Sequence, residues 1–382
     1  MKKRVAIIGT AGIPARYGGF ETLAHHLVKN LGEHYDFKVY CDGTAYAKSE
    51  RQTYWQHARL YYLPLKANGL QSIFYDIFSM IHALFVADTL IVLGVSGGIF
   101  LPFIKLLSSK QIIVNIDGLE WKRDKWNRMA RWFLKFSEKI AVKYSHHQVS
   151  DNAKIQEYVE QEYGLVSQLI AYGADHCQRE NLEAEDYQNY PFLANNYAFK
   201  VCRIEPENNV HKILAAYSKM PDQTLVVVGN WANSEYGKKL RASYIDLKNI
   251  YMLDPIYQAT TLNKLRANCS LYVHGHSAGG TNPSLVEAMY LKLPVLAFDV
   301  GYNRATTRNQ GVYFKNEEDL KSKITGLNQQ KRQEIADMMY AIASEHYTWQ
   351  QIASQYSRLI HEAGYSHKNI IINQEQLAEV HD

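Results

Sequence analysis

The stretch HGHSAGGTNPSLVEAM, residues 274–289, follows a short apolar run, Leu271–His274, and leads into an amphipathic segment. Its glycine pair allows a sharp backbone turn. Asn282 is a favourable helix N-cap residue and Pro283 a favourable first helical residue. The stretch therefore predicts a strand, a turn and a helix whose free N–H groups can hold a phosphate.

The same alternation of strand and helix extends in both directions along the chain, which predicts an α/β fold with parallel sheets covered on both faces. Strands are expected at Val5–Gly9, Phe37–Cys41, Leu60–Leu63, Thr89–Leu93, Gln111–Ile116, Phe199–Arg203, Thr224–Gly229, Ile250–Leu253, Leu271–His274 and Val295–Phe298. Helices are expected at 20–31, 71–86, 125–144, 151–162, 210–219, 234–244, 258–267, 283–292 and 349–362.

A polar, acidic stretch interrupts this alternation near the middle of the chain and predicts a boundary between two Rossmann-like domains that face a central cleft. The expected parts are an N-terminal acceptor-binding domain at 1–178, a linker at 179–196, a C-terminal donor-binding domain at 197–345, a helix at 346–364 that packs back on the first domain, and a tail at 365–382.

Composition narrows the function classes. A net charge of +4 over 382 residues is too small for a nucleic-acid binder. The four cysteines are scattered without metal-ligand spacing, and they fit a reducing cytoplasm. Glycines and Pro102 interrupt the most apolar stretch, 89–107, so a strand, a turn and a short helix are expected there rather than a membrane span.

A second glycine-rich loop, residues 9–21, joins the first expected strand to the first helix. Gly18 and Gly19 stand at the helix entry, where N–H groups can approach a phosphate. The G-x-G-x-x-G spacing of dinucleotide-binding proteins and the P-loop signature are both absent. An ordinary tight turn explains the loop equally well.

These motifs resemble those of the family 4 retaining glycosyltransferases, which have the GT-B fold. Glu287, in Glu-Ala-Met, matches the second acid of the motif that grips the nucleotide sugar, and Arg203 matches the arginine that neutralises the diphosphate. Two positions depart from the family pattern: Gly279 replaces the first acid and Asn208 replaces a lysine. His211 or Lys212 is a candidate to compensate for that lysine.

Four stretches together resemble a narrower group, the bacterial β-1,4-rhamnosyltransferases of capsule and rhamnan synthesis. They are residues 12–21, 117–123, 203–209 and the Gly-Gly-Thr-Asn-Pro-Ser run at 279–284. The resemblance implies dTDP-L-rhamnose as donor and N-acetylglucosamine or glucose on undecaprenyl diphosphate as acceptor. It also implies no metal and no other cofactor.

The candidate residues fall into three groups. The expected catalytic residues are Asp117, Asp151, Arg203 and Glu287. The expected donor-binding residues are Gly18, Gly19, Arg203, His211, His276, Gly280, Thr281, Asn282, Ser284 and Glu287. The expected acceptor or membrane contacts are Arg16, Tyr17, Glu120, Trp121, Lys122, Arg123, Trp126, Arg128 and Tyr172.

Structural roles compete with several of these assignments. Asp117 precedes a glycine, a pair typical of turns, and Asp151 is a candidate N-cap for the helix that follows it. Glu287 could instead be a solvated residue on a capped helix, and Arg203 an ordinary surface ion pair.

A basic segment at 122–143 holds eight cations against two acids. Its cations and tryptophans suggest contact with anionic lipid head groups or with an acceptor diphosphate. Its apolar residues, by contrast, are expected to pack in the core; they are Trp126, Met129, Phe133, Phe136, Ile140 and Tyr144.

The sequence therefore predicts a nucleotide-sugar-dependent transferase in the cytoplasm, peripherally bound to the inner face of the membrane. A different nucleotide-sugar donor, or a non-catalytic sugar-nucleotide-binding subunit, remains an alternative. An epimerase or dehydrogenase would need the missing dinucleotide fingerprint. The oligomeric state is left open.

Overall fold

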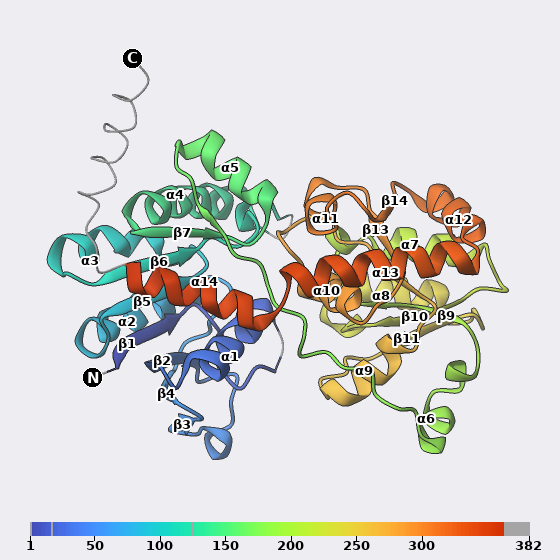
Figure 1. Cartoon of the computed structure of the whole chain (residues 1–382), viewed down its shortest axis with the longest axis horizontal. Helices are drawn as coiled ribbons and strands as arrows, with labels where there is room; N and C mark the ends of the chain where they lie inside the picture. Colours follow the sequence, from blue (N-terminus) through green and yellow to red (C-terminus); the bar gives the residue numbers. More distant parts are fainter. Residues whose placement is uncertain (1, 17, 124–125, 363–382) are drawn as a thin grey trace.

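Two sheets, each covered by helices on both faces, form the two halves of the molecule (Figure 1). The structure is a computed structural model and describes residues 2–16, 18–123 and 126–362. The expected tail, 365–382, lies outside these residues. Within them, no helix combines the length and apolar character needed to cross a bilayer.

The N-terminal sheet has the strand order β3-β4-β2-β1-β5-β6-β7-β8, in which only the β3–β4 pair is antiparallel. Its strands are β1 (Lys3–Ile8), β2 (Tyr35–Asp42), β3 (Tyr54–Trp55), β4 (Ala58–Leu63), β5 (Thr89–Leu93), β6 (Gln111–Asn115), β7 (His147–Ser150) and β8 (Gln168–Leu169). Its helices are α1 (Gly19–Leu31), α2 (Gln71–Val86), α3 (Leu101–Leu107), α4 (Arg128–Tyr144) and α5 (Ala153–Tyr163).

The C-terminal sheet is fully parallel, in the order β11-β10-β9-β12-β13-β14. Its strands are β9 (Tyr197–Val201), β10 (Thr224–Val228), β11 (Ile250–Leu253), β12 (Leu271–His274), β13 (Val295–Phe298) and β14 (Val312–Phe314). Its helices are α7 (Val210–Ser218), α8 (Glu235–Tyr244), α9 (Ala259–Ala267), α10 (Pro283–Tyr290), α11 (Gly301–Thr306), α12 (Glu317–Gly326) and α13 (Gln329–His346). The strand order reverses between β9 and β12, which is where open α/β sheets bind ligands.

One hydrophobic core runs through both halves. Residues of β1, α1, β9, α10 and α13 belong to a single buried cluster, which also includes the last described helix, α14 (Trp349–Glu362). In α14 the hydroxyl of Tyr356 accepts a hydrogen bond of 2.9 Å from Asn115 at the end of β6. Figure 1 shows α13 on the C-terminal half and α14 returning across the N-terminal half.

The fold class and most of the expected elements are confirmed. The apolar stretch 89–107 contains β5 and α3, as expected for a strand followed by a short helix. The polar stretch taken as a linker contains a further helix, α6 (Ala184–Asn189). Elements with weak periodicity, including β14 and the helices α11 to α13, were not expected.

The expectation that the apolar residues of α4 pack in the core is wrong for Met129 and Phe136, which are both exposed. The buried face carries Ser137, Glu138 and Ala141 instead. Small residues are needed there because Gly98 approaches Ser137 and Ala141 closely. Glu138 is tolerated inside because the hydroxyls of Tyr158 and Tyr163 donate hydrogen bonds of 2.5 and 2.6 Å to it. Leu134 and Val142 share this buried face, whereas Met129, Trp132 and Phe136 turn outward.

Candidate active site

The loops that follow β6 and β12 touch where the two domains meet. A Cβ atom added to Gly118, after β6, would lie 2.4 Å from the Cα atom of Gly279 and from the backbone nitrogen of Gly280. A side chain on Gly118 would therefore hold the domains apart. The loop around Gly280, predicted from sequence as a donor-binding position, thus also lies in the contact between the two domains.

The N-termini of α1 and α10 meet at the same junction. A Cβ atom on Gly19 would lie 3.4 Å from the ring of Tyr172 and 3.5 Å from Pro283, so the first turn of α1 approaches the first turn of α10. Asn282 caps α10 as expected, and its side chain accepts a hydrogen bond of 3.1 Å from the Ser284 N–H. Two helix N-termini thus present their partial positive charges close together.

Asp151, which follows β7, lies against Gly280 of the other domain, since a Cβ atom on Gly280 would overlap the Asp151 carboxyl group. Its Oδ1 atom has no hydrogen-bond partner among the described residues. Burial, followed by the charge of Asp117, raises the pKa of Asp151 well above its ordinary value. Both effects favour the neutral form of the Asp151 carboxyl group at the junction.

Asp151 is not the N-cap of the helix that follows it, which was the alternative role considered for it. The N-cap of α5 is Asn152, whose side chain accepts a hydrogen bond of 3.0 Å from the Lys154 N–H. The Asn152 side-chain amide also donates across the junction to the Thr281 hydroxyl at 3.2 Å and to the Thr306 hydroxyl at 3.1 Å. The Thr281 hydroxyl in turn donates to the Asp151 carbonyl at 2.6 Å. This link between the domains leaves no signal in the sequence, because its members lie about 130 residues or more apart.

Two guanidinium groups, one from each domain, act on the same histidine. Arg203 follows β9, and its side chain is 46% exposed. Arg123 follows the short helix at Glu120–Lys122. Burial, then His274, Lys200 and the charges of Arg203 and Arg123, lower the pKa of His276 well below its ordinary value. The positive charges of Arg203 and Arg123 thus both reach the His276 ring, and with burial they favour its neutral form.

Arg123 was predicted only as an acceptor or membrane contact, and the structure brings it into the junction. Although burial opposes its charge, Glu120, Asp117, Glu207 and Glu205 together raise the pKa of Arg123. Its Nε atom lies 2.9 Å from a carboxylate oxygen of Glu120. Because Glu205 and Glu207 belong to the C-terminal domain, Arg123 is an interdomain cation.

The position that holds a lysine in the resembled family has a structural role. The side-chain amide of Asn208 points inward and donates a hydrogen bond of 2.6 Å to the carbonyl of Arg203. His211 contacts the hydroxyl of Tyr236 at 2.8 Å, and burial lowers its pKa, so its ring is neutral near pH 7. The ammonium group of Lys212 lies 4.5 Å from the ring centre of Phe298. The side chains of His211 and Lys212 are thus engaged with Tyr236 and Phe298. The charges of Arg123 and Arg203, by contrast, both act on Glu207 and His276.

Only 15% of the Glu287 side chain is exposed, and its carboxylate is paired, so it is not a freely solvated residue. One carboxylate oxygen forms an ion pair with Arg266, and the other lies 3.3 Å from Nε2 of His176. Although burial opposes the charge, Arg266 and His176 lower the pKa of Glu287 to about 2. A donor hydroxyl would have to share these carboxylate oxygens with two existing partners.

The same cluster contains three potential metal ligands. His176, Cys177 and Glu287 bring one ligand atom each within 4.8 Å of one another. The Arg266 guanidinium already forms hydrogen bonds with Glu287 and, at 3.1 Å, with Cys177, so an added cation would compete with it. This cluster could not be predicted from the sequence, because Arg266 and His176 belong to no recognised motif.

The remaining acceptor candidates do not form one site. Arg16 forms an exposed ion pair of 2.9 Å with Glu50. Tyr172 is buried at the junction, so it cannot face a membrane. Tyr17 lies outside the described residues.

The candidates around the start of α4 lie close together. The indole N–H of Trp126 donates to Glu120 at 3.1 Å. Lys122 and Lys135 lie 5.3 and 4.8 Å from the ring centre of Trp121. Arg128, the first residue of α4, is exposed.

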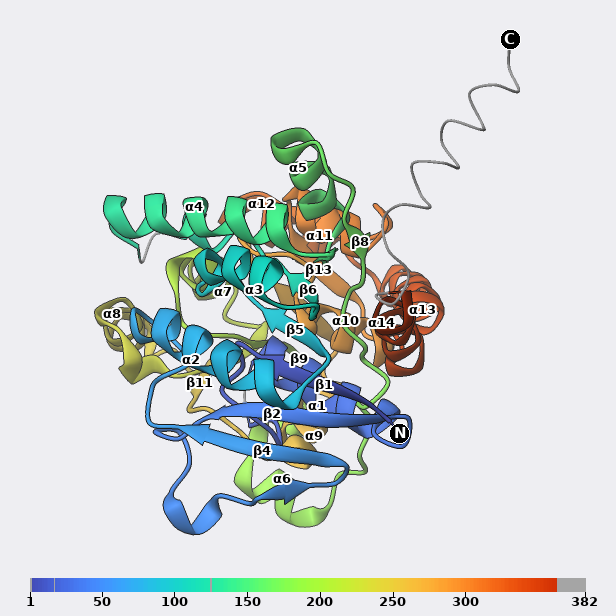
Figure 2. The ribbon, with the colours of Figure 1, turned by 90° about the vertical axis from the view of Figure 1, so that its left-hand side faces the viewer.

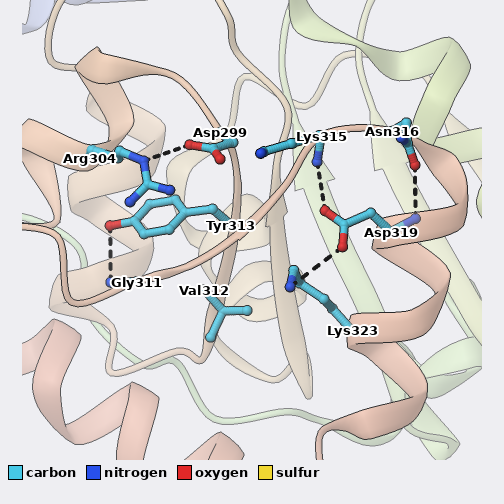
Figure 3. Close-up of a pocket in the computed structure, with 9 residues that line it drawn as sticks. All are labelled: Asp299, Arg304, Gly311, Val312, Tyr313, Lys315, Asn316, Asp319 and Lys323. Atoms are coloured by element: carbon cyan, nitrogen blue, oxygen red, sulfur yellow. Dashed lines mark hydrogen bonds and ion pairs between the residues drawn. The ribbon is translucent and has the colours of Figure 1, made fainter.

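A surface pocket at the edge of the C-terminal sheet is separate from this junction (Figure 3). Its charged side chains largely pair with one another. Arg304 forms an ion pair of 2.6 Å with Asp299 and lies over the ring of Tyr313, while Asp319 pairs with Lys323 at 3.5 Å. This self-neutralised pocket offers little unpaired charge to a ligand.

Two family models match the chain. Residues 2–175 match a domain of unknown function (DUF1972), and residues 184–345 match the model described as Glycosyl transferases group 1. No curated protein matched the sequence.

Solved structures with a similar fold confirm the GT-B architecture. The sucrose-phosphate synthase of Thermosynechococcus elongatus superposes with a TM-score of 0.79 at 14% identity, covering 94% of this chain and 99% of that one. Anabaena Alr3699/HepE in complex with UDP has a TM-score of 0.72 at 17% identity, covering 95% and 100%. The trehalose 6-phosphate synthase of Burkholderia multivorans has a TM-score of 0.68 at 10% identity, covering 98% of both chains.

Proposed function

We propose that this chain, a group 1 glycosyltransferase with the GT-B fold, transfers L-rhamnose from dTDP-β-L-rhamnose to a lipid-linked sugar with retention of configuration. The acceptor is N-acetylglucosamine or glucose on undecaprenyl diphosphate, presented at the inner face of the plasma membrane. The donor and acceptor follow from the resemblance of residues 12–21, 117–123 and 203–209 to bacterial rhamnosyltransferases.

One observation carries the proposal: the loop after β6 meets the loop leading to the N-terminus of α10, so that a Cβ atom on Gly118 would lie 2.4 Å from the backbone nitrogen of Gly280. Arg123 follows Gly118 on the N-terminal-domain side of this junction, and Arg203 follows strand β9 of the other domain. A nucleoside diphosphate leaves as an anion, so its departure is favoured by fixed positive charge placed before the reaction begins. Two guanidinium groups and the dipole of α10 supply such charge without a proton transfer.

Little acid–base chemistry is required of the protein in this reaction. The raised pKa of Asp151 favours its neutral form, which can donate a hydrogen bond but is a poor base. Asp117 lies within electrostatic reach of Asp151 and Arg123, and we assign it the orientation of the acceptor hydroxyl. A donor phosphate oxygen then accepts the acceptor proton as the new glycosidic bond forms.

A different donor is the second candidate, and it has its own support. Anabaena Alr3699/HepE was solved in complex with UDP-glucose, with a TM-score of 0.71 at 15% identity to this chain. A uridine-linked hexose in place of dTDP-rhamnose would leave the diphosphate chemistry at Arg123 and Arg203 unchanged. The two candidate functions differ only in the contacts that the protein makes to the nucleotide base and to the sugar of the donor.

A non-catalytic sugar-nucleotide-binding subunit is the third candidate, because Gly279 replaces the first acid of the family motif. The backbone at Gly279 has φ of 111°, a conformation that side-chain-bearing residues rarely adopt. The loop is therefore built around glycine. Sugar contacts at this point would come from backbone groups.

The deciding experiment offers the purified full chain a panel of donors: dTDP-L-rhamnose, UDP-glucose, UDP-N-acetylglucosamine and GDP-mannose. Each is incubated with undecaprenyl-diphosphate-linked N-acetylglucosamine or glucose, and the product is identified by mass spectrometry. Product from dTDP-rhamnose alone supports the proposal. Product from a uridine donor alone replaces it with the second candidate, and donor binding by calorimetry without product favours the third.

A further inference from the structure

Helix α2 exposes a continuous apolar stripe. Phe74, Phe78, Ile81 and Phe85 are all exposed, Phe85 by 78%, and their spacing of four, three and four residues places them along one side of the helix. The opposite side, with Tyr75, Met80 and Ala83, packs in the core of the N-terminal domain. The buried side also holds Ser72, Asp76 and Ser79. The large apolar side chains of α2 therefore lie on its outer face as well as in the core.

The stripe continues over the two adjacent helices. On α3 it includes Phe103, Leu106 and Leu107, and on α4 it includes Met129, Trp132 and Phe136. Leu106 and Met129 are 83% and 82% exposed. Figure 2 shows α4, α3 and α2 following one another on the same side of the N-terminal domain. The outward apolar side chains of these three helices are called the apolar face below.

The charges on the apolar face have a single sign. The exposed charged residues of the three helices are all cations: Lys105, Arg128, Lys139 and Lys143. The two acids within these helices, Asp76 and Glu138, are 2% and 1% exposed. Lys135, which lies nearest α5, is half-buried and pairs with Glu162. The apolar face thus combines large aromatic side chains with uncompensated positive charge.

We propose that the apolar face docks on an anionic lipid bilayer. Aromatic and aliphatic side chains enter the boundary between head groups and acyl chains, while lysine and arginine interact with anionic head groups. A second copy of the chain fits this surface poorly. A two-fold interface sets identical patches against each other, so the four exposed cations would meet the same four cations.

The orientation of the apolar face agrees with the proposed function, on which this step rests. The N-terminal end of α4, which carries Met129 and Trp132, is tied to the junction because Arg131 donates a hydrogen bond of 3.3 Å to the carbonyl of Arg123. Arg123 is the N-terminal-domain cation of the candidate active site. Docking through α4 would therefore place the membrane surface next to the site that receives a lipid-linked acceptor.

The test is flotation of the purified full chain with vesicles, without nucleotide or acceptor. The vesicles contain either phosphatidylcholine alone or equal parts of phosphatidylglycerol and phosphatidylcholine. We expect binding to the anionic vesicles that weakens with added salt. The triple variant Phe78→Ser/Phe85→Ser/Leu106→Ser should lower the partition coefficient at least about tenfold, and Lys139→Gln/Lys143→Gln should lower it about tenfold.

The matched control is Val166→Ser/Ile245→Ser/Met338→Ser, which removes three exposed apolar side chains elsewhere on the surface. It should bind vesicles as the wild type does, and all variants should keep the wild-type thermal unfolding midpoint. Equal binding by the triple variant and this control would overturn the proposal. Self-association in analytical ultracentrifugation that the triple variant abolishes would assign the face to a second copy instead.

The outcome is separable from the fate of the proposed function. Vesicle binding needs no donor, so it is measured whether or not the donor panel gives a product. If transfer is found, the triple variant should lose activity toward acceptor in vesicles and keep activity toward a water-soluble acceptor analogue. Loss toward both acceptors would instead indicate damage to the active site.

Discussion

The carboxyl group of Asp151 lies against the α-carbon of Gly280, and the two residues belong to different domains. Any side chain on Gly280 must push Asp151 away and open the junction. We therefore expect Gly280→Ala to lower kcat/KM about tenfold or more, since small displacements of positioned groups are costly in rate. Steady-state kinetics with the identified donor measure this effect.

The control for this change is Gly326→Ala at the end of α12, where an added Cβ atom meets nothing within 4 Å. It should leave kcat/KM unchanged. Equal activity of both alanine variants and the wild type would mean that the contact between Asp151 and Gly280 plays no part in turnover.

Glu287 should make the stability of the protein depend on pH in the acid range. Arg266 and His176 hold its pKa at about 2 in the folded chain, whereas an unfolded glutamate titrates near ~4.3. The ion pairs therefore stabilise the fold fully above ~4.3, and this stabilisation is lost as the pH falls toward 2. The shift corresponds to about 3 kcal/mol.

Glu287→Gln removes this charge and leaves Arg266 buried without a counter-ion. We expect its free energy of unfolding at pH 7 to fall by about 3 kcal/mol, with a flatter pH dependence between pH 5 and 2 than the wild type. Urea unfolding across this range measures both quantities. Parallel pH profiles for the two proteins would show that Glu287 is not the titrating group. We also expect turnover to fall about tenfold or more.

The sequence predicted the sheets well because their strands are short runs of apolar residues bounded by glycine or polar residues, and such runs have few alternative structures. The helix entry at Asn282 was predicted for a similar local reason, since its cap and proline act within one turn. Contacts between domains could not be predicted in this way. Asn152 and Arg266 look like ordinary polar residues until folding brings their partners to them.

The prediction that the apolar stripe of α4 packs in the core failed for a different physical reason. Helical periodicity identifies an apolar side but not what covers it. In α4 the core side carries Leu134 and Val142 together with small residues and a hydrogen-bonded glutamate, Glu138, which periodicity assigns to solvent. Phe136 and Met129 were therefore predicted to be buried and are exposed.

Arg123 and Arg203, at the junction between the domains, should both stabilise the departing nucleoside diphosphate. We expect Arg203→Ala and Arg123→Ala each to lower turnover about tenfold or more, corresponding to about 1.4 kcal/mol of transition-state stabilisation. Arg4→Ala is the control, because Arg4 pairs with Asp88 at 2.6 Å on the surface of the N-terminal domain. Wild-type turnover in both junction variants would remove the proposed stabilisation of the leaving diphosphate.

The raised pKa of Asp151 should make stability change with pH in the opposite direction to the lowered pKa of Glu287. Burial and the charge of Asp117 keep the Asp151 carboxyl protonated in the folded chain at a pH where the unfolded chain ionises it. The contribution of Asp151 to the free energy of unfolding therefore falls as the pH rises above ~3.9. Asp151→Asn, which resembles the neutral acid, should be more stable than the wild type at pH 7 and nearly equal to it near pH 4. Thermal unfolding at the two pH values measures the difference. A variant that is less stable at pH 7 would mean that Asp151 is ionised in the fold.

Restoring the first acid of the family motif should not restore a family-like site. At Gly279 the backbone has φ of 111°, and an added Cβ atom would meet nothing within 4 Å. The obstacle to a side chain is therefore backbone strain rather than space, at about 1–2 kcal/mol. We expect Gly279→Glu and Gly279→Ala to lose similar stability and similar kcat/KM, because both impose the same strain and the added carboxylate finds no prepared partner. Unfolding and steady-state kinetics on the pair separate strain from charge. Higher turnover in Gly279→Glu than in Gly279→Ala would show that the loop rearranges around the donor and that a carboxylate can still serve there.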